Sequence, residues 1–142
     1  MKKYRQTVIP EASTKAWSGL SKYATQKKVF DYYKANYLLN GKHVINQDLG
    51  ISVAFERKGA EKTSFGGFIY SKKACLVEIL DKVIRYAEYS NWGDRKPQDI
   101  PTVLGYLNFK VKVRIDGIME HVHLVIRVNN SGKFHYSMDI NK

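Results

Sequence analysis

Apolar and polar residues alternate along the last forty residues of the chain. In "YLNFKVKVRI" apolar side chains alternate with basic ones, namely Phe109, Val111, Val113 and Ile115 with Lys110, Lys112 and Arg114. The stretches "MEHVHLVIRV" and "KFHYSMDI" alternate in the same way. A period of two residues is typical of strands that bury one face. The pattern therefore predicts a three-stranded antiparallel meander, with turns at Asp116-Gly117 and at "NNSG".

The Asp116-Gly117 turn sets the expected register of the first two strands. A two-residue type I′ turn requires positive φ at both positions, which Asp and Gly tolerate. With these residues as the loop, Lys112 faces His121 and Lys110 faces His123. Because directly opposed residues share a sheet face, two lysines and two imidazoles are expected to lie together.

The second turn extends this polar face to a third strand. Matching the apolar faces across "NNSG" aligns Leu124 with Tyr136, which places His123 near Ser137. In that register His135 lies beside Val125. One face is then expected to collect basic side chains, three histidines and a serine: Lys110, Lys112, Arg114, His121, His123, Arg127, Lys133, His135 and Ser137.

Helical spacing marks two earlier segments. Residues 12–39 carry it, with Ser13 as a candidate N-cap, Gly19 as a candidate break and Asn40-Gly41 as a C-terminal stop. Ser71 precedes a second helix, expected to run to about Ser90. Its apolar stripe consists of Leu76, Ile79, Leu80, Val83 and Ala87.

Two β-branched runs between these helices, at residues 44–45 and 51–55, flank a turn at residues 48–50 and predict a hairpin. Residues 60–71 and 91–101 carry glycine and proline turn signals and are expected to be loops. The expected fold is a single α+β domain. It has an N-terminal helical extension (1–42) and a core (43–142) in which the helix at 72–90 packs on the apolar face of the sheet, formed by Val111, Val122, Leu124 and Ile126.

Net charge narrows the range of partners. The chain has 24 Lys and Arg against 13 Asp and Glu, a formal charge of +11. A field of that sign attracts polyanions, so nucleic acid is the expected partner, with acidic proteins and anionic membranes as open alternatives. No apolar run approaches the roughly 18 residues of a membrane helix. The N-terminal lysines are not followed by the apolar stretch of a secretory signal. Among these polyanions we expect nucleic acid as the partner and no membrane.

The lone cysteine, Cys75, excludes an internal disulfide framework and a cysteine-based zinc cage. A reduced, cytoplasmic setting is expected. The His121-x-His123 pair supplies fewer ligands than the three or four that zinc takes, and the lysines opposite would repel a cation. We therefore expect no metal and no other cofactor.

Four stretches together resemble a known family: "INQDLGISVAFERKGAEKT", "LVEILDKVIRYAEY", "YLNFKVKVRIDGIMEHVHLVIRV" and "GKFHYSMDI". They are similar to a domain of phage large polyvalent proteins and related mobile elements, within the barnase–EndoU–colicin–RelE-like nuclease superfamily. The resemblance covers residues 44–140 and leaves the N-terminal helices outside. It implies a helical layer on an antiparallel sheet and metal-free cleavage of RNA, often tRNA or mRNA. Lys62 best matches the basic position of the family after the hairpin.

Two features depart from the family pattern. The family usually has other residues at the positions of His121 and His123, and the loop after Lys62 reads "TSFGG", without a histidine before the glycines. The inference of a nuclease site therefore depends on the chemistry of the residues themselves.

Metal-free RNA cleavage needs a base for the 2′-OH proton, an acid for the leaving oxygen and cations for the phosphorane. Histidine serves as acid or base near neutral pH. The candidate catalytic residues are His121, His123, Lys62, His135 and Arg127, and the candidate nucleic-acid-binding residues are Lys110, Lys112, Arg114, Lys133 and Ser137. The alternative for this face is a set of polar side chains that simply face water.

The expected function is that of a metal-independent endoribonuclease of a phage or mobile element, with RNA as its partner. Two other interpretations stay open. One is a non-catalytic phage inhibitor of a host defence nuclease, of the anti-CRISPR type, and the other is a basic nucleic-acid-binding module. A phage inhibitor would have a host protein or ribonucleoprotein as its partner. A nuclease would have a cognate inhibitor as a partner in addition to RNA. Tyr70, Tyr106 and Trp92 are candidates for stacking on bases.

Overall fold

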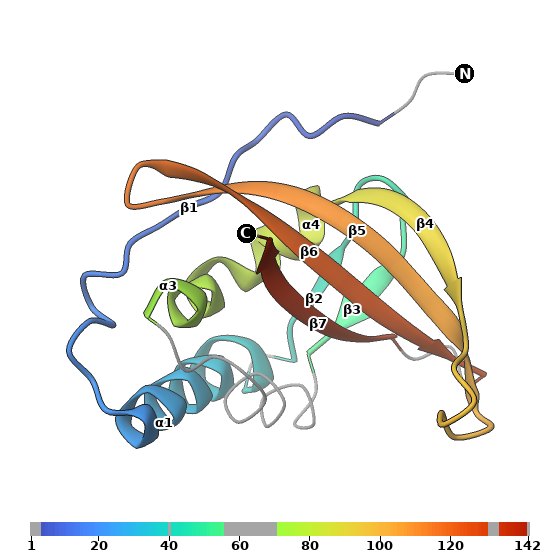
Figure 1. Cartoon of the computed structure of the whole chain (residues 1–142), viewed down its shortest axis with the longest axis horizontal. Coiled ribbons are helices and arrows are strands. Elements are labelled where there is room, and N and C mark those ends of the chain that lie inside the picture. The colour runs from blue at the N-terminus through green and yellow to red at the C-terminus, as the bar shows by residue number, and fades with distance from the viewer. Residues whose placement is uncertain (1–3, 40, 56–70, 131–133, 142) are drawn as a thin grey trace.

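The structure is a computed structural model that describes residues 4–39, 41–55, 71–130 and 134–141, and for several residues of the last range it describes the backbone alone. The main sheet contains β1 (Glu11–Ala12), β4 (Glu88–Asp94), β5 (Val103–Ile115), β6 (Ile118–Asn129) and β7 (Phe134–Asn141). The strand order is β1-β5-β6-β7. Strand β4 pairs with the same edge of β5 as β1 does, but at a different part of that strand. Figure 1 shows β5 and β6 crossing the molecule side by side. The predicted α+β class and the C-terminal meander are confirmed.

The β5–β6 hairpin has the predicted turn and register. The φ angles are 51° at Asp116 and 79° at Gly117, as a type I′ turn requires. Lys112 lies opposite His121 and Lys110 lies opposite His123. The turn is a local feature, so its two residues were enough to fix the pairing of these two long strands.

The predicted register of β6 with β7 is wrong by two residues. Leu124 lies opposite Met138, not opposite Tyr136. The other pairs along this ladder include His123 with Asp139, Val125 with Ser137 and Arg127 with His135. A shift of two residues keeps the same side chains on each face, so the apolar pattern could not distinguish the two registers.

The second helical region ends earlier than predicted. It consists of α3 (Ser71–Ala74), a 3₁₀ segment (Cys75–Ile79) and α4 (Leu80–Tyr86). Residues 88–94, predicted as the helix end and part of a loop, instead form β4, which pairs antiparallel with β5. The aromatic ring of Tyr89 meets that of Phe109, with their centroids 5.7 Å apart. This long-range packing explains why a strand forms where the local pattern was ambiguous.

The N-terminal helix begins later than predicted. Helix α1 (Lys22–Tyr33) continues as a π-helical turn (Lys34–Leu38). Ser21, not Ser13, caps it, because its side chain accepts the N–H of Ala24 at 3.1 Å. Gly19 has a φ of 75°, which confirms the predicted break. The stretch before it contains β1, which pairs parallel with β5.

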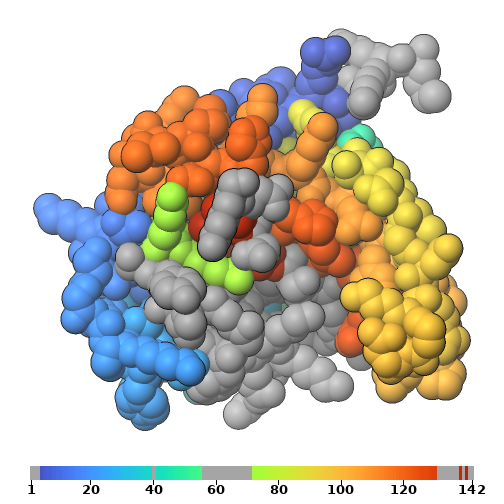
Figure 2. Space-filling model, viewed as in Figure 1, coloured from blue at the N-terminus to red at the C-terminus, as the bar shows by residue number. Residues whose placement is uncertain are grey.

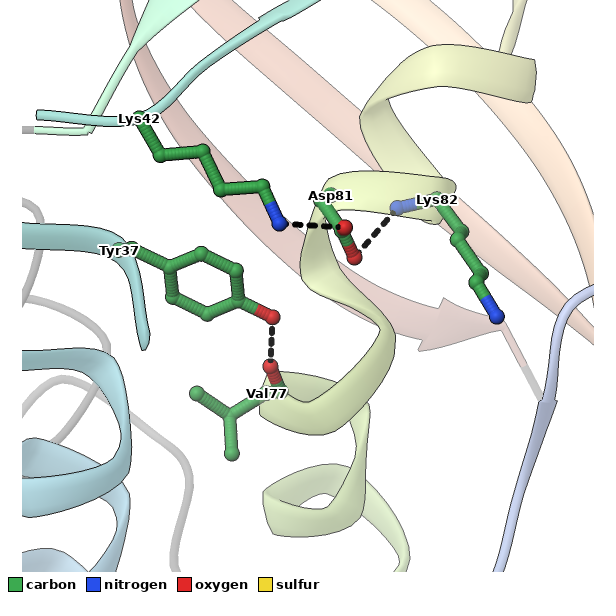
Figure 3. Close-up of polar contacts among 5 residues, drawn as sticks. All are labelled: Tyr37, Lys42, Val77, Asp81 and Lys82. Atoms are coloured by element: carbon green, nitrogen blue, oxygen red, sulfur yellow. Dashed lines mark hydrogen bonds and ion pairs between the residues drawn. The ribbon is translucent and has the colours of Figure 1, made fainter. Parts of the chain in front are cut away.

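The predicted hairpin is present as a separate two-stranded sheet, β2 (His43–Ile45) and β3 (Ser52–Ala54). Contacts with the helices anchor it. Lys42, next to β2, forms an ion pair of 2.9 Å with Asp81 of α4. Beside it, the hydroxyl of Tyr37 donates a hydrogen bond of 2.5 Å to the carbonyl of Val77 (Figure 3).

One hydrophobic core joins the helices to the inner face of the sheet. The sheet contributes Phe109, Val111, Val113, Ile115, Val122, Leu124 and Ile126, and the α3–α4 segment contributes Leu76, Ile79, Leu80 and Val83. This packing confirms the predicted contact between that segment and the apolar face. His121 and His123 therefore project from the opposite, outer face. None of the helices in the described ranges is long and apolar enough to span a membrane.

Candidate functional site

The outer face of β5 and β6 carries the polar side chains that the sequence analysis selected. Lys110, Lys112 and His121 are exposed, and His123 is half-buried. Their immediate neighbours along the strands, such as Val111 and Val122, are buried in the core. The two-residue period of the strands therefore sorts the basic and imidazole groups to one side.

A pocket with a volume of about 190 Å³ opens on this face. It is lined by residues from four segments of the chain, namely Gln6, Glu88, Lys110, Val111, Lys112 and His121. Three of these, Lys110, Lys112 and His121, are residues predicted from the sequence. The pocket thus brings together an imidazole, a carboxylate and two ammonium groups.

Gln6 fixes the backbone at one side of the pocket. Its side-chain Nε2 donates to the carbonyl of Lys112 at 2.7 Å, and its Oε1 accepts the N–H of Lys112 at 2.9 Å. The carboxamide thereby imitates the backbone of a neighbouring strand at a position that neither β1 nor β4 covers. These two hydrogen bonds hold the backbone of β5 in place at Lys112.

Glu88 is a pocket residue that the sequence analysis missed. Its Oε1 accepts the backbone N–H of Gln6 at 2.7 Å, and it lies opposite Lys110 in the β4–β5 pairing. A β-bulge between Tyr89 and Asn91 shifts the register of β4. The two-residue period, the signal that could have revealed Glu88, is interrupted at that point.

The two histidines have different surroundings. His121 is exposed and lines the pocket. His123 has its Nε2 at 3.1 Å from Oδ1 of Asn108. The amide nitrogen of Asn108 donates to the carbonyl of Asn91 at 3.3 Å, which leaves Oδ1 as the acceptor facing the imidazole. His123 therefore donates from Nε2, and its Nδ1 is the nitrogen available for proton transfer.

Arg127 lies away from the pocket. It follows His123 by four residues on the same face, which is about 13 Å along a strand at about 3.3 Å per residue. Its register partner on β5 is Tyr106. Its Nε is buried and has no hydrogen-bond partner among the described residues. The structure therefore separates Arg127 from His121 and His123, the other predicted catalytic residues of β6.

The remaining predicted residues have other positions. Arg114 extends toward the β1 end of the face, where its Nη1 lies 3.8 Å from a carboxylate oxygen of Glu11. For His135 and Ser137 the structure gives only their places in β7, opposite Arg127 and Val125. Lys62, Lys133 and Tyr70 lie outside the described residues. Within the described ranges, no three His, Cys, Asp or Glu side chains come together as a potential metal site.

The two aromatic candidates for base stacking lie on opposite faces. Tyr106 is on the outer face beside Arg127. Trp92 covers Gly105 on the inner side, where a Cβ added to the glycine would lie 2.0 Å from a ring carbon. Of the two, only Tyr106 shares a surface with the histidines.

The pocket and His123 together supply the groups that phosphodiester chemistry needs. Imidazoles of His121 and His123 can accept and donate protons, and Lys110 and Lys112 can stabilise negative charge on a phosphate. Glu88 adds a carboxylate whose Oε1 already accepts the backbone N–H of Gln6. The geometry thus suits an anionic ligand with a transferable proton.

Comparison with known proteins finds a family model described as large polyvalent protein-associated domain 3, which matches residues 21–136. No curated protein and no solved structure matches the chain. The match begins at α1, so the N-terminal helix that the resemblance left outside lies within the family domain. The part of the resemblance that concerns large polyvalent proteins is confirmed.

Proposed function

The chain belongs to the family of large polyvalent protein-associated domain 3, and from the outer face of its sheet we propose that it is a metal-independent endoribonuclease. The observation that carries this proposal is the register of β5 and β6. It sets Lys112 opposite His121 and Lys110 opposite His123 on the face turned away from the core. A pocket of about 190 Å³ at this position gives a phosphate group room to enter.

The proposed reaction is an attack of the ribose 2′-oxygen on the adjacent phosphorus. A neutral imidazole takes the 2′-OH proton, the P–O5′ bond breaks, and a protonated imidazole gives its proton to O5′. His121 and His123 fill these two roles, and Lys110 and Lys112 stabilise the phosphorane. The products are a 2′,3′-cyclic phosphate and a 5′-hydroxyl end.

Two further features support RNA as the substrate. The formal charge of +11 favours encounter with a polyanion. The sequence also resembles the barnase–EndoU–colicin–RelE-like nucleases of phages and mobile elements, whose members cut tRNA or mRNA without metal. We propose that this chain shares that ancestry and that class of substrate, in a cytoplasmic setting.

The proposal is tested by incubating the purified chain with total tRNA in the presence of a chelator. We expect cleavage that leaves 2′,3′-cyclic phosphate ends and spares DNA of the same sequence, which lacks the 2′-OH. A His121→Ala/His123→Ala variant should lose activity by at least about 10²-fold, the contribution of one positioned acid–base group. His43→Ala is the matched control, because His43 is exposed on the separate sheet formed by β2 and β3.

Two results would contradict the proposal. Full activity of the folded double variant would place the chemistry elsewhere, with Lys62 as the next candidate. Absence of RNA cleavage by the parent chain would favour a non-catalytic role, either inhibition of a host defence nuclease or simple nucleic-acid binding.

A further inference from the structure

A second cluster of polar side chains lies at the far end of the same outer face. Tyr106 of β5 and Arg127 of β6 are opposite one another and are both half-buried. The connection between β4 and β5, residues 95–102, projects at this end of the molecule, drawn in gold in Figures 1 and 2. The cluster is thus built by the sheet and by this loop together.

Asp99 holds the loop against the sheet. Its Oδ2 accepts the hydroxyl of Tyr106 at 2.6 Å and the backbone N–H of Lys96 at 2.7 Å. These hydrogen bonds, that from Tyr106 first, lower the pKa of Asp99. The ammonium of Lys96 lies 5.4 Å from the centre of the Tyr106 ring. The loop therefore presents its cations beside Arg127 in a fixed arrangement.

The cluster carries more positive than negative charge. Arg95, Lys96 and Arg127 surround one carboxylate, Asp99, whose Oδ2 is already occupied by two donors. Among the described residues, the buried Nε–H of Arg127 has no hydrogen-bond acceptor. The charge of Arg127 acts on the Asp99 carboxylate and, after the two hydrogen bonds, contributes to lowering its pKa. A planar guanidinium is well suited to bind a phosphate oxygen.

Arg127 is too distant to act on a phosphate in the pocket. It follows His121 by six positions along β6, which is about 20 Å at about 3.3 Å per residue. An arginine side chain does not span that gap. A polynucleotide does, since about 20 Å corresponds to about six stacked nucleotides at 3.4 Å each, and to fewer when the strand is extended.

We propose that Arg127 and Lys96 form a phosphate-binding subsite for single-stranded nucleic acid whose reacting phosphate lies in the His121 pocket. Arg127 is then a binding residue and not a catalytic one. Contacts to phosphate carry no sequence information, so the subsite sets the minimum length of the ligand and not its sequence. The inference rests on the proposed function only for the reaction at the phosphate in the His121 pocket.

The test compares ligands that can and cannot reach both ends. We would measure fluorescence anisotropy with labelled oligo-dT of two and of eight nucleotides, because DNA binds without being cut. Arg127→Gln should weaken binding of the octamer by about tenfold or more, as expected for a lost charge-assisted hydrogen bond. Its log–log salt slope should fall by about 0.7, the value for one phosphate on a single strand. Binding of the dinucleotide should stay unchanged.

Two further variants control for folding and for general charge. Lys96→Gln lies on the exposed loop and should give the same length-dependent loss without disturbing the sheet. Arg85→Gln removes the same charge from the exposed side of α4, and the octamer should still bind as it does to the parent. Thermal melts of each variant establish that the fold is retained.

The outcomes separate this inference from the proposed function. An equal loss for both ligands, or no loss for either, would overturn the subsite. Length-dependent binding in a chain that never cuts RNA would overturn the ribonuclease and support the subsite. RNA cleavage that does not depend on substrate length and is unchanged in the Arg127→Gln variant would support the ribonuclease and overturn the subsite.

Discussion

His123 and Asn108 are joined across β5 and β6 by a contact of 3.1 Å between Nε2 and Oδ1. Because Asn108 in turn donates to the carbonyl of Asn91 on β4, three strands determine which imidazole nitrogen carries the proton. The orientation of the ring is thus set by the sheet and not by solvent.

Replacement of Asn108 by alanine should release this constraint. We expect both neutral tautomers of His123 to become populated and RNA cleavage to fall by about tenfold, less than the loss expected for removal of the imidazole itself. Nitrogen-15 shifts of the imidazole report the tautomers, and tRNA cleavage reports the rate. An unchanged tautomer with an unchanged rate would show that Asn108 does not position the ring. Asn36→Ala, on the exposed side of the π-helical turn, is the control.

Loss of charge beside the pocket should weaken nucleic-acid binding in a salt-dependent way. Lys112→Gln removes one exposed cation of the outer face, and the slope of log K against log salt should fall by about 0.7 on a single strand. Titrations of oligo-dT between low and physiological salt measure it. Lys82→Gln, on the exposed side of α4, should leave the slope unchanged. Equal effects of both variants would indicate attraction by overall charge alone.

Asn46 should contribute strongly to stability. It is fully buried and its amide nitrogen donates to the carbonyls of Ile84 and Ala87 at 2.8 and 3.0 Å. Its Oδ1 accepts the N–H groups of Asp48 and Leu49. Asn46→Ala should lower the free energy of unfolding by about 3 kcal/mol, because buried backbone groups lose their partners. Urea denaturation measures this change, and a loss below about 1 kcal/mol would contradict it.

Gly105 should tolerate no side chain while Trp92 is present. A Cβ there would lie 2.0 Å from the indole and 2.7 Å from the carbonyl of Gly93. We expect Gly105→Ala to destabilise the fold by about 1–3 kcal/mol, the cost of overpacking, with a shift in tryptophan fluorescence. Adding Trp92→Ala should recover part of that stability. If the two changes were additive, the proposed clash would be wrong.

The fold should lose stability at alkaline pH. Burial raises the pKa of the Cys75 thiol to about 12 from 9.0, and burial also raises the pKa of Tyr37 above 10.0. Both groups hold their protons more firmly in the folded state, so their stabilising effect is complete below pH 9 and declines as the pH rises beyond 9–10. Denaturation curves from pH 8 to pH 11 measure the decline. Tyr37→Phe should make it shallower, and a pH-independent parent would contradict the prediction.

Local signals made one part of the site predictable. The Asp116-Gly117 turn dictates the pairing of β5 with β6, so the opposition of Lys112 and His121 followed from the sequence. The position of β7 did not follow, because a shift by two residues buries the same face. The start of the family domain was also predicted wrongly. The resemblance began at residue 44, whereas the family model begins at residue 21, just before α1, whose sequence carries few specific motifs.

The other half of the pocket depends on contacts that no local pattern encodes. Gln6 and Glu88 are 82 residues apart and meet through one hydrogen bond of 2.7 Å. Glu88 also stands at the start of β4, where the bulge after Tyr89 interrupts alternation. In the sequence, neither the glutamine at position 6 nor the glutamate at position 88 indicates a site. They form part of one only when the folded sheet brings them together.

The N-terminal segment has a consequence for association between chains. Along the outer edge of β5, alternate residues are covered in turn: Lys110 lies against β4, Lys112 binds the Gln6 carboxamide, and the N–H groups of Arg114 and Asp116 donate to the carbonyls of Pro10 and Ala12. An uncovered strand edge is a template on which another chain can add a strand and begin to aggregate. The Gln6 side chain fills the interval between the part of β5 that β4 covers and the part that the β1 segment covers, and so closes that interval to a strand from another chain.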